Sequence, residues 1–104
     1  MHILINKKKY NLIECNDFYS RFKGLMFVKD FDYCIMFKKC NSIHTFFMST
    51  CIDVVMTDKD DNVLYIFKSV KPWRVILPKK NVYSVYELPA GTINKNIKKI
   101  KVGE

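Results

Sequence analysis

The sequence lacks the features that would direct a chain out of the cell or across a bilayer. Residues 1–6 contain neither the basic start nor the long apolar run and small-residue cleavage site of a secretory signal. No later run approaches the roughly 20 apolar residues that span a bilayer. We therefore expect a cytoplasmic protein with no membrane partner.

The chain also lacks a Ser-, Gly- or Pro-rich linker, a long block of like charge and an internal repeat. With 104 residues, 49% of them apolar and 14% aromatic, it has room for one hydrophobic core. Residues 1–104 are therefore expected to form a single domain.

Arginine is scarce, although the chain is strongly basic. The formal net charge is +8, yet Arg21 and Arg74 are the only arginines and all the other basic residues are lysines. Lysine attracts phosphate without the bidentate geometry that lets arginine recognise bases and phosphates. We interpret the lysines as solvated surface, so nucleic acid is not the expected partner. Weak, non-specific nucleic-acid binding through surface lysines is kept as an alternative.

No two cysteines have Cys-x-x-Cys spacing. The four cysteines, Cys15, Cys34, Cys40 and Cys51, are even in number, but without an export signal we expect reduced thiols. A well-apolar chain of this length needs no disulfides to fold. The cysteines are therefore expected to be buried or half-buried thiols that act as small hydrophobes.

What the chain does contain is a succession of short β-prone runs. Residues 3–5 and 10–15 predict an opening hairpin, and the continuous apolar run 33–37 is typical of a strand covered on both faces. Further strands are expected over 43–48, 52–57, 62–67 and 82–88, with a hairpin turn at 58–61. Pro72 and Pro78 bracket a loop or edge segment, and 97–102 predicts a short last strand.

One segment has a helix signal. Asn16 or Asp17 is a suitable N-cap, apolar residues follow at 18, 22 and 25, and Gly24 is placed to end the helix. Several short strands and one helix in so small a chain must wrap a single core. We therefore predict a mostly β (α+β) fold, a small curled sheet or partly closed β-barrel with one short helix near the N-terminus.

Ordered motifs extend from position 21 to the end of the chain. Residues 21–26 read Arg-Phe-Lys-Gly-Leu-Met, and residues 40–48 read Cys-Asn-Ser-Ile-His-Thr-Phe-Phe-Met. Ile-Asp-Val-Val at 52–55, Lys-Pro-Trp-Arg at 71–74, Glu-Leu-Pro-Ala-Gly-Thr-Ile at 87–93 and Lys-Val-Gly at 101–103 follow in register. With these motifs the sequence resembles the domain of unknown function 192 family of uncharacterised bacterial and archaeal proteins. The resemblance implies a small, mostly β domain and brings no assigned activity with it.

The densest polar chemistry in an apolar neighbourhood is formed by Ser42, His44, Thr45 and Asp53. Alternation along a strand over 43–48 would place His44 and Thr45 on opposite faces. If the segment with Asp53 pairs with this strand, an Asp53–His44 hydrogen bond would hold the imidazole as a general base or ligand contact. A structural histidine, held by backbone or water, is the other interpretation.

A zinc site would have to recruit Cys40, His44 and Cys51. A thiolate and an imidazole four residues apart can reach one metal, but the chain lacks the two closely spaced ligand pairs of structural zinc folds. We therefore predict no metal and no other cofactor.

Three further side chains complete the candidate site. Arg21 and Glu87 lie beside apolar positions, so each needs a partner if it is buried. An Arg21 ion pair with Asp53 or Glu87 is one interpretation, and anion binding by Arg21 in a pocket is the other. Trp73 lies between two cations, where it could stack on a ligand, although we expect it to fold back as a lid on the core.

The leading hypothesis is a small, non-catalytic binding or accessory module whose concave site is lined by Arg21, His44, Asp53, Trp73 and Glu87. Its ligand would be a small anionic molecule or a peptide segment. A hydrolase-type enzyme that uses His44 with Asp53 is the alternative from another class.

Overall fold

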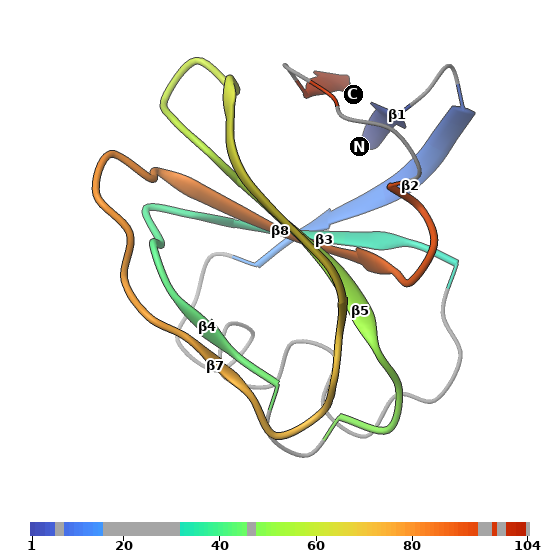
Figure 1. Ribbon diagram of the computed structural model, residues 1–104. Helices are drawn as coiled ribbons and strands as arrows, with labels where there is room; N and C mark the ends of the chain where they lie inside the picture. Colours follow the sequence, from blue (N-terminus) through green and yellow to red (C-terminus); the bar gives the residue numbers. More distant parts are fainter. Residues whose placement is uncertain (6–7, 16–31, 46–47, 94–96, 98–99, 104) are drawn as a thin grey trace.

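The computed structural model describes residues 1–5, 8–15, 32–45, 48–93, 97 and 100–103. Within these ranges the chain forms nine strands and no helix. The strands in chain order are β1 (His2–Ile5), β2 (Lys8–Glu14), β3 (Cys34–Lys38), β4 (Ile43–His44), β5 (Ile52–Thr57), β6 (Val63–Val70), β7 (Val75–Ile76), β8 (Ser84–Pro89) and β9 (Lys101–Gly103) (Figure 1).

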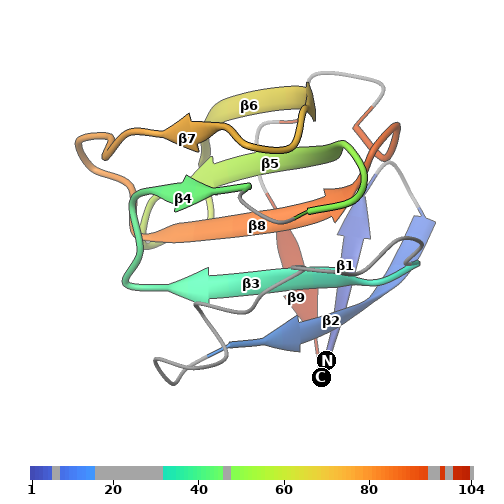
Figure 2. The same cartoon turned by 90° about the horizontal axis from the view of Figure 1, so that it is seen from below.

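Seven strands form one sheet in the order β6-β5-β8-β3-β2-β1-β9. Neighbouring strands are antiparallel, except that β2 and β3 are parallel. The sheet curls, so that β1 and β9 run steeply across the direction of β5 and β8 (Figure 2). The predicted mostly β class and curled sheet are therefore confirmed. Among the described strands β6 and β9 do not pair, so the sheet is a half-barrel rather than a closed one.

The strands β4 and β7 form a separate two-stranded antiparallel sheet, in which Ile43 pairs with Ile76 and His44 with Val75. Ile43 and Ile76 pack against a buried cluster of the central strands. The small sheet therefore covers one face of the main sheet, beside β5 and β8 (Figure 2). The prediction that Pro72 and Pro78 bracket a loop or edge segment is confirmed by the two-residue β7.

The central strands β3, β5 and β8 are buried on both faces, because apolar residues cover each side of the sheet. We call the cluster on one face the terminal-strand cluster, since it includes residues next to both chain ends: Ile3, Ile5, Leu12, Cys34, Met36, Val55, Tyr86, Leu88, Ile93 and Ile100. The cluster on the other face is the small-sheet cluster: Cys15, Ile35, Phe37, Met48, Ile52, Val54, Met56, Ile76 and Val85.

Several local predictions are confirmed. The opening hairpin is formed by β1 and β2, and the apolar run 33–37 contains β3, whose first four residues are buried. The acidic turn at 58–61 joins β5 to β6, with Asp58 Oδ1 accepting hydrogen bonds from the amides of Asp60 and Asn62. Such a side-chain acceptor is the usual way in which aspartate holds a turn.

The strand expected over 43–48 is wrong in its length, because the described strand contains only Ile43 and His44. Its partner cannot continue the ladder: Pro72 has no amide hydrogen and Trp73 has a φ of +63°. Residues 46–47 and the helix expected between Asn16 and Gly24 lie outside the described residues, and the helix stays a prediction.

Candidate functional site

Asp53 lies on β5 with 1% of its surface exposed, and backbone amides occupy both of its carboxylate oxygens. Oδ1 accepts from the Ser69 amide at 2.8 Å, while Oδ2 accepts from Gly91 at 3.1 Å and Ile93 at 3.0 Å. Ser69 lies where the β5–β6 register shifts, and Gly91 lies in the turn after β8, both with positive φ. Asp53 therefore supplies acceptors to two irregular segments.

Glu87 points to the opposite face of the sheet from Asp53. Asp53 is paired with Leu88, a member of the terminal-strand cluster, whereas Glu87 lies between Ile35 and Val54 of the small-sheet cluster. Glu87 is 4% exposed, and its Oε1 is buried without a hydrogen-bond partner in the part of the chain described. Burial raises the pKa of Glu87 from 4.5 to about 8, so its carboxyl group is largely protonated at neutral pH.

His44 pairs with the exposed residue Val75, on the other side of the small sheet from the buried pair Ile43 and Ile76. Alternation along a strand therefore directs His44 away from the small-sheet cluster. The expected Asp53–His44 hydrogen bond is not formed, since Asp53 bonds three amides instead. Consequently the fold does not bring His44, Asp53 and Glu87 into one hollow.

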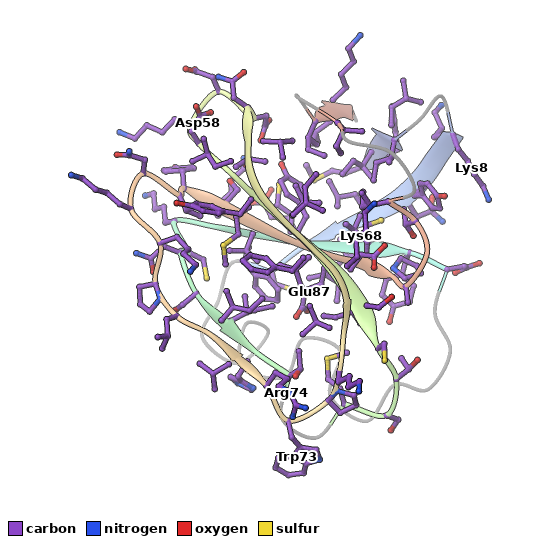
Figure 3. The ribbon with its side chains drawn as sticks, viewed as in Figure 1. Lys8, Asp58, Lys68, Trp73, Arg74 and Glu87 are labelled. Atoms are coloured by element: carbon purple, nitrogen blue, oxygen red, sulfur yellow. The ribbon has the colours of Figure 1, made fainter. Side chains whose placement is uncertain are left out.

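Trp73 does not fold back as a lid, because 57% of its surface is exposed. Figure 3 shows its side chain at the outer tip of the β6–β7 connection, far from the centrally placed Glu87. The expectation of a lid is therefore wrong: Trp73 lies in a bend between β6 and β7, where its φ is +63°. Arg21, the remaining member of the predicted site, lies outside the described residues.

The four cysteines are free thiols, two buried and two half-buried, as expected. Burial raises the pKa of Cys34 to about 12, which keeps its thiol protonated and unreactive. Cys40 Sγ donates to the Ser42 carbonyl at 3.0 Å. Over the described ranges, Cys40, His44 and Cys51 included, no three His, Cys, Asp or Glu residues are placed to hold a metal ion.

A hollow of about 490 Å³ lies at one end of the main sheet, close to the β5–β6 turn that Asp58 marks in Figure 3. Its walls come from the end of β3, that turn and the start of β8. We call it the lysine pocket, and its lining residues are Lys38, Lys39, Lys59, Asp61, Tyr83 and Ser84.

Backbone and ring contacts hold the walls of the lysine pocket together. The Tyr83 amide donates to the Thr57 carbonyl at 2.8 Å, and the Tyr83 carbonyl accepts from the Cys40 amide at 3.0 Å. Lys59 Nζ lies 6.0 Å from the centroid of the Tyr83 ring. Tyr83 therefore links the ends of β5 and β3 and presents its ring beside a cation.

Asp61 is the single carboxylate among the lining residues, and its Oδ1 is engaged from inside the fold. The buried Tyr86 hydroxyl donates to Asp61 Oδ1 at 2.8 Å, and Thr57 Oγ1 donates to it at 3.4 Å. Burial and the hydrogen bond to Asp61 raise the pKa of Tyr86, so the phenol remains a donor. Three lysines and one carboxylate therefore line the pocket, and the lining residues have a formal excess of positive charge.

Sequence reasoning missed this pocket because it treated the lysines as dispersed surface. Lys38-Lys39 and Lys59 are 20 residues apart, and only the pairing of β8 with both β3 and β5 brings them together. A signal was present in the sequence: Lys38-Lys39 directly follow the predicted strand 33–37, and Lys59 lies in the predicted turn at 58–61.

Comparisons with known proteins identify relatives without a known role. The residues that the structure describes include no helix long and apolar enough to cross a membrane. An uncharacterised protein of Thermococcus kodakarensis is 40% identical over 82 residues, which is 73% of this chain and 52% of the relative. One from Thermococcus sibiricus is 35% identical over 103 residues, covering 88% of this chain and 66% of the relative. The chain thus spans about half to two thirds of these relatives.

Two crystal structures share the fold. A protein of unknown function from Novosphingobium aromaticivorans has a TM-score of 0.78 at 14% identity, over 97% of this chain and 82% of that one. A protein from Sinorhizobium meliloti, described as a candidate transcription regulator, has a TM-score of 0.80 at 16% identity, over 96% and 89%. The model of the DUF192 family, an uncharacterised family with no assigned function, matches residues 2–104. This chain therefore belongs to the DUF192 family.

Proposed function

We propose that the domain is a binding module for a small anionic ligand, which it holds in the lysine pocket. The observation that carries the proposal is the convergence of Lys38, Lys39 and Lys59 on one hollow whose single carboxylate is engaged from within. Like charges gathered in a concave site repel one another and attract an anion. An anionic ligand would therefore be stabilised there.

The shape and chemistry of the pocket favour a small ligand over a polymer. Its volume of about 490 Å³ lies within the range of small-molecule sites. Lysine ammonium groups are mobile point charges that suit phosphate and carboxylate groups, and the Tyr83 ring adds an apolar wall. Lys38 also lies 3.9 Å from Glu14 Oε1, so Lys39 and Lys59 are the better positions for a test.

The two alternatives from the sequence remain predictions. The hydrolase-type enzyme depended on His44 acting with Asp53, and the described geometry does not form that pair. Non-specific nucleic-acid binding would use lysines all over the surface, so it should not depend on the lysine pocket.

We expect inorganic pyrophosphate at low ionic strength to raise the melting temperature of the native chain, since a ligand of the folded state stabilises it. The double variant Lys39→Gln/Lys59→Gln should bind pyrophosphate about tenfold more weakly or worse, because two of three cations are lost. Isothermal calorimetry with pyrophosphate, and with phosphate and citrate beside it, measures the affinities.

The matched control is Lys9→Gln/Lys101→Gln, which removes the same charge from exposed positions on β2 and β9. It should change the affinity much less than the pocket variant does, since neither lysine lines the lysine pocket and the attraction between charges weakens with distance. Equal weakening in both double variants, or no response of the native chain to any of the three anions, would contradict the proposal.

A further inference from the structure

The small sheet presents a stripe of exposed apolar side chains. Val75 is 54% exposed and Leu77 is 66% exposed, while Ile76 between them is buried, as expected for an extended segment with one face to the core. Trp73, at 57% exposure, lies two residues before Val75 at the outer tip of the β6–β7 connection (Figure 3). We call Trp73, Val75 and Leu77 the tryptophan tip.

The chain segments that form the small sheet and the tryptophan tip contain no acidic residue. Residues 33–52 and 62–86, which contain both strands of the small sheet, include no Asp or Glu. Lys71 and Arg74 flank Trp73 and are exposed, and Lys79-Lys80 follows the other end of the stripe. A complementary surface must therefore be both anionic and able to accept apolar side chains.

Thr45 forms hydrogen bonds with the backbone amide and carbonyl groups of the tryptophan tip and its neighbours. Its hydroxyl donates to the Lys71 carbonyl at 2.7 Å and accepts from the Arg74 amide at 2.8 Å. Its amide donates to the Arg74 carbonyl at 2.8 Å, and its carbonyl accepts from the Trp73 amide at 2.9 Å. Pro72 has no amide hydrogen to satisfy. These bonds lower the cost of dehydrating the tip, since exposed polar backbone is what makes entry into an apolar phase expensive.

An extended peptide is a poorer fit to this surface than a lipid bilayer. Strand addition needs a free row of backbone donors and acceptors. The strand β7 is only two residues long, and Pro72 and Pro78 lie on either side of it. The tip is also a projection rather than a groove (Figure 3). Tryptophan beside cations is the combination that settles at the headgroup level of membranes.

We propose that the tryptophan tip docks the domain onto an anionic lipid surface, with Trp73 inserted among the headgroups and Lys71 and Arg74 in contact with anionic lipids. This is a peripheral contact, which needs no spanning segment. It departs from the expectation of no membrane partner, which rested only on the lack of a long apolar run. It is independent of the lysine pocket and extends the function proposed above.

Trp73 is the only tryptophan of the chain, so its fluorescence reports on the tip alone. The native full chain is mixed at low salt with one of two kinds of vesicle. Neutral vesicles contain phosphatidylcholine alone, and anionic vesicles contain phosphatidylcholine with about one third phosphatidylserine. We expect a blue shift of emission only with the anionic vesicles, and quenching when their lipids carry bromine on the acyl chains. Both effects should weaken as salt is raised.

Three results would overturn the proposal. One is unchanged emission with anionic vesicles at low salt. Another is sedimentation with the vesicles without quenching by brominated lipid, which would place the contact elsewhere on the basic surface. The third is quenching by a single-stranded oligonucleotide with no response to vesicles, which would assign Trp73 to base stacking.

Variants test the same point by co-sedimentation with anionic vesicles. Trp73→Ala should lower the partition coefficient about tenfold, whereas Leu64→Ala, an exposed apolar residue on β6, should change it less than twofold. Lys71→Gln/Arg74→Gln should lower the partition coefficient by about fivefold for each cation removed. Lys9→Gln/Lys101→Gln should lower the partition coefficient much less. Equal effects of the tip and control variants would count against the proposal, and Lys39→Gln/Lys59→Gln should leave the quenching of Trp73 intact.

Discussion

Glu87→Gln is expected to be more stable than the native chain above about pH 8 and to lose this advantage as the pH falls toward 4.5. The native carboxyl is buried between Ile35 and Val54, and its Oε1 has no partner in the described structure. Burial disfavours the deprotonated, charged form of this carboxyl group, whereas glutamine stays neutral at every pH. The difference between the two chains therefore isolates one titration.

The sign follows from proton binding. The pKa of Glu87 is raised from 4.5 to about 8 in the folded state, so the folded chain binds more protons than the unfolded chain between these values. The stabilising contribution of the protonated group is complete below about pH 4.5 and is lost as the pH rises through 8. At about 1.4 kcal/mol per pKa unit, the change is on the order of a few kcal/mol.

Urea denaturation of both chains at several pH values between 4.5 and 9 measures this difference. Glu87→Met is a useful second variant, because an apolar side chain of similar size removes the unpartnered oxygen as well. It should also show no such titration, and should be at least as stable as Glu87→Gln. Parallel pH profiles for the native chain and Glu87→Gln would show that Glu87 is solvated or paired in solution.

Asp53→Ala is expected to destabilise the domain by about 3–5 kcal/mol, the largest loss that we predict for a single substitution. Three amides, those of Ser69, Gly91 and Ile93, would lose a charged acceptor at once. Domains of this size have only about 5–15 kcal/mol of total stability, so such a loss could prevent Asp53→Ala from folding. Asp53→Asn is therefore the variant to measure if Asp53→Ala does not fold. It keeps one carbonyl acceptor and should lose less.

Urea denaturation gives the global loss, and hydrogen exchange of the three amides gives the local one. Exchange at Ser69, Gly91 and Ile93 should accelerate in Asp53→Asn relative to the other amides of β5 and β8. Asp60→Ala, on the exposed turn, is the control and should cost less than about 0.5 kcal/mol. Unchanged relative exchange at the three amides would mean that Asp53 does not hold these segments.

The geometry around Asp53 also explains two of the motifs that carry the family resemblance. Ile-Asp-Val-Val contributes the acceptor, and Glu-Leu-Pro-Ala-Gly-Thr-Ile contributes two of its donors, at Gly91 and Ile93. The Thr92 hydroxyl closes the same turn by donating to the Pro89 carbonyl at 2.6 Å. The aspartate that seemed suited to orient an imidazole is therefore accounted for by the need to satisfy buried backbone.

The amino-acid sequence by itself determined the class of the fold and most of its local elements. Alternation, apolar runs and turn residues are local signals, so the opening hairpin, the doubly covered strand at 33–37 and the turn held by Asp58 could be predicted from neighbouring residues. The ordered motifs also identified the family.

Only the tertiary structure decided which side chains meet. Strand order and register are set by contacts between residues far apart in the chain, and they placed Asp53 and Glu87 on opposite faces of one sheet and His44 on another surface. The same pairing gathered Lys38, Lys39 and Lys59 around one pocket. Adjacency in sequence could not reveal this, because each residue step along a strand reverses the face, while the pairings of β8 with β3 and β5 join positions tens of residues apart.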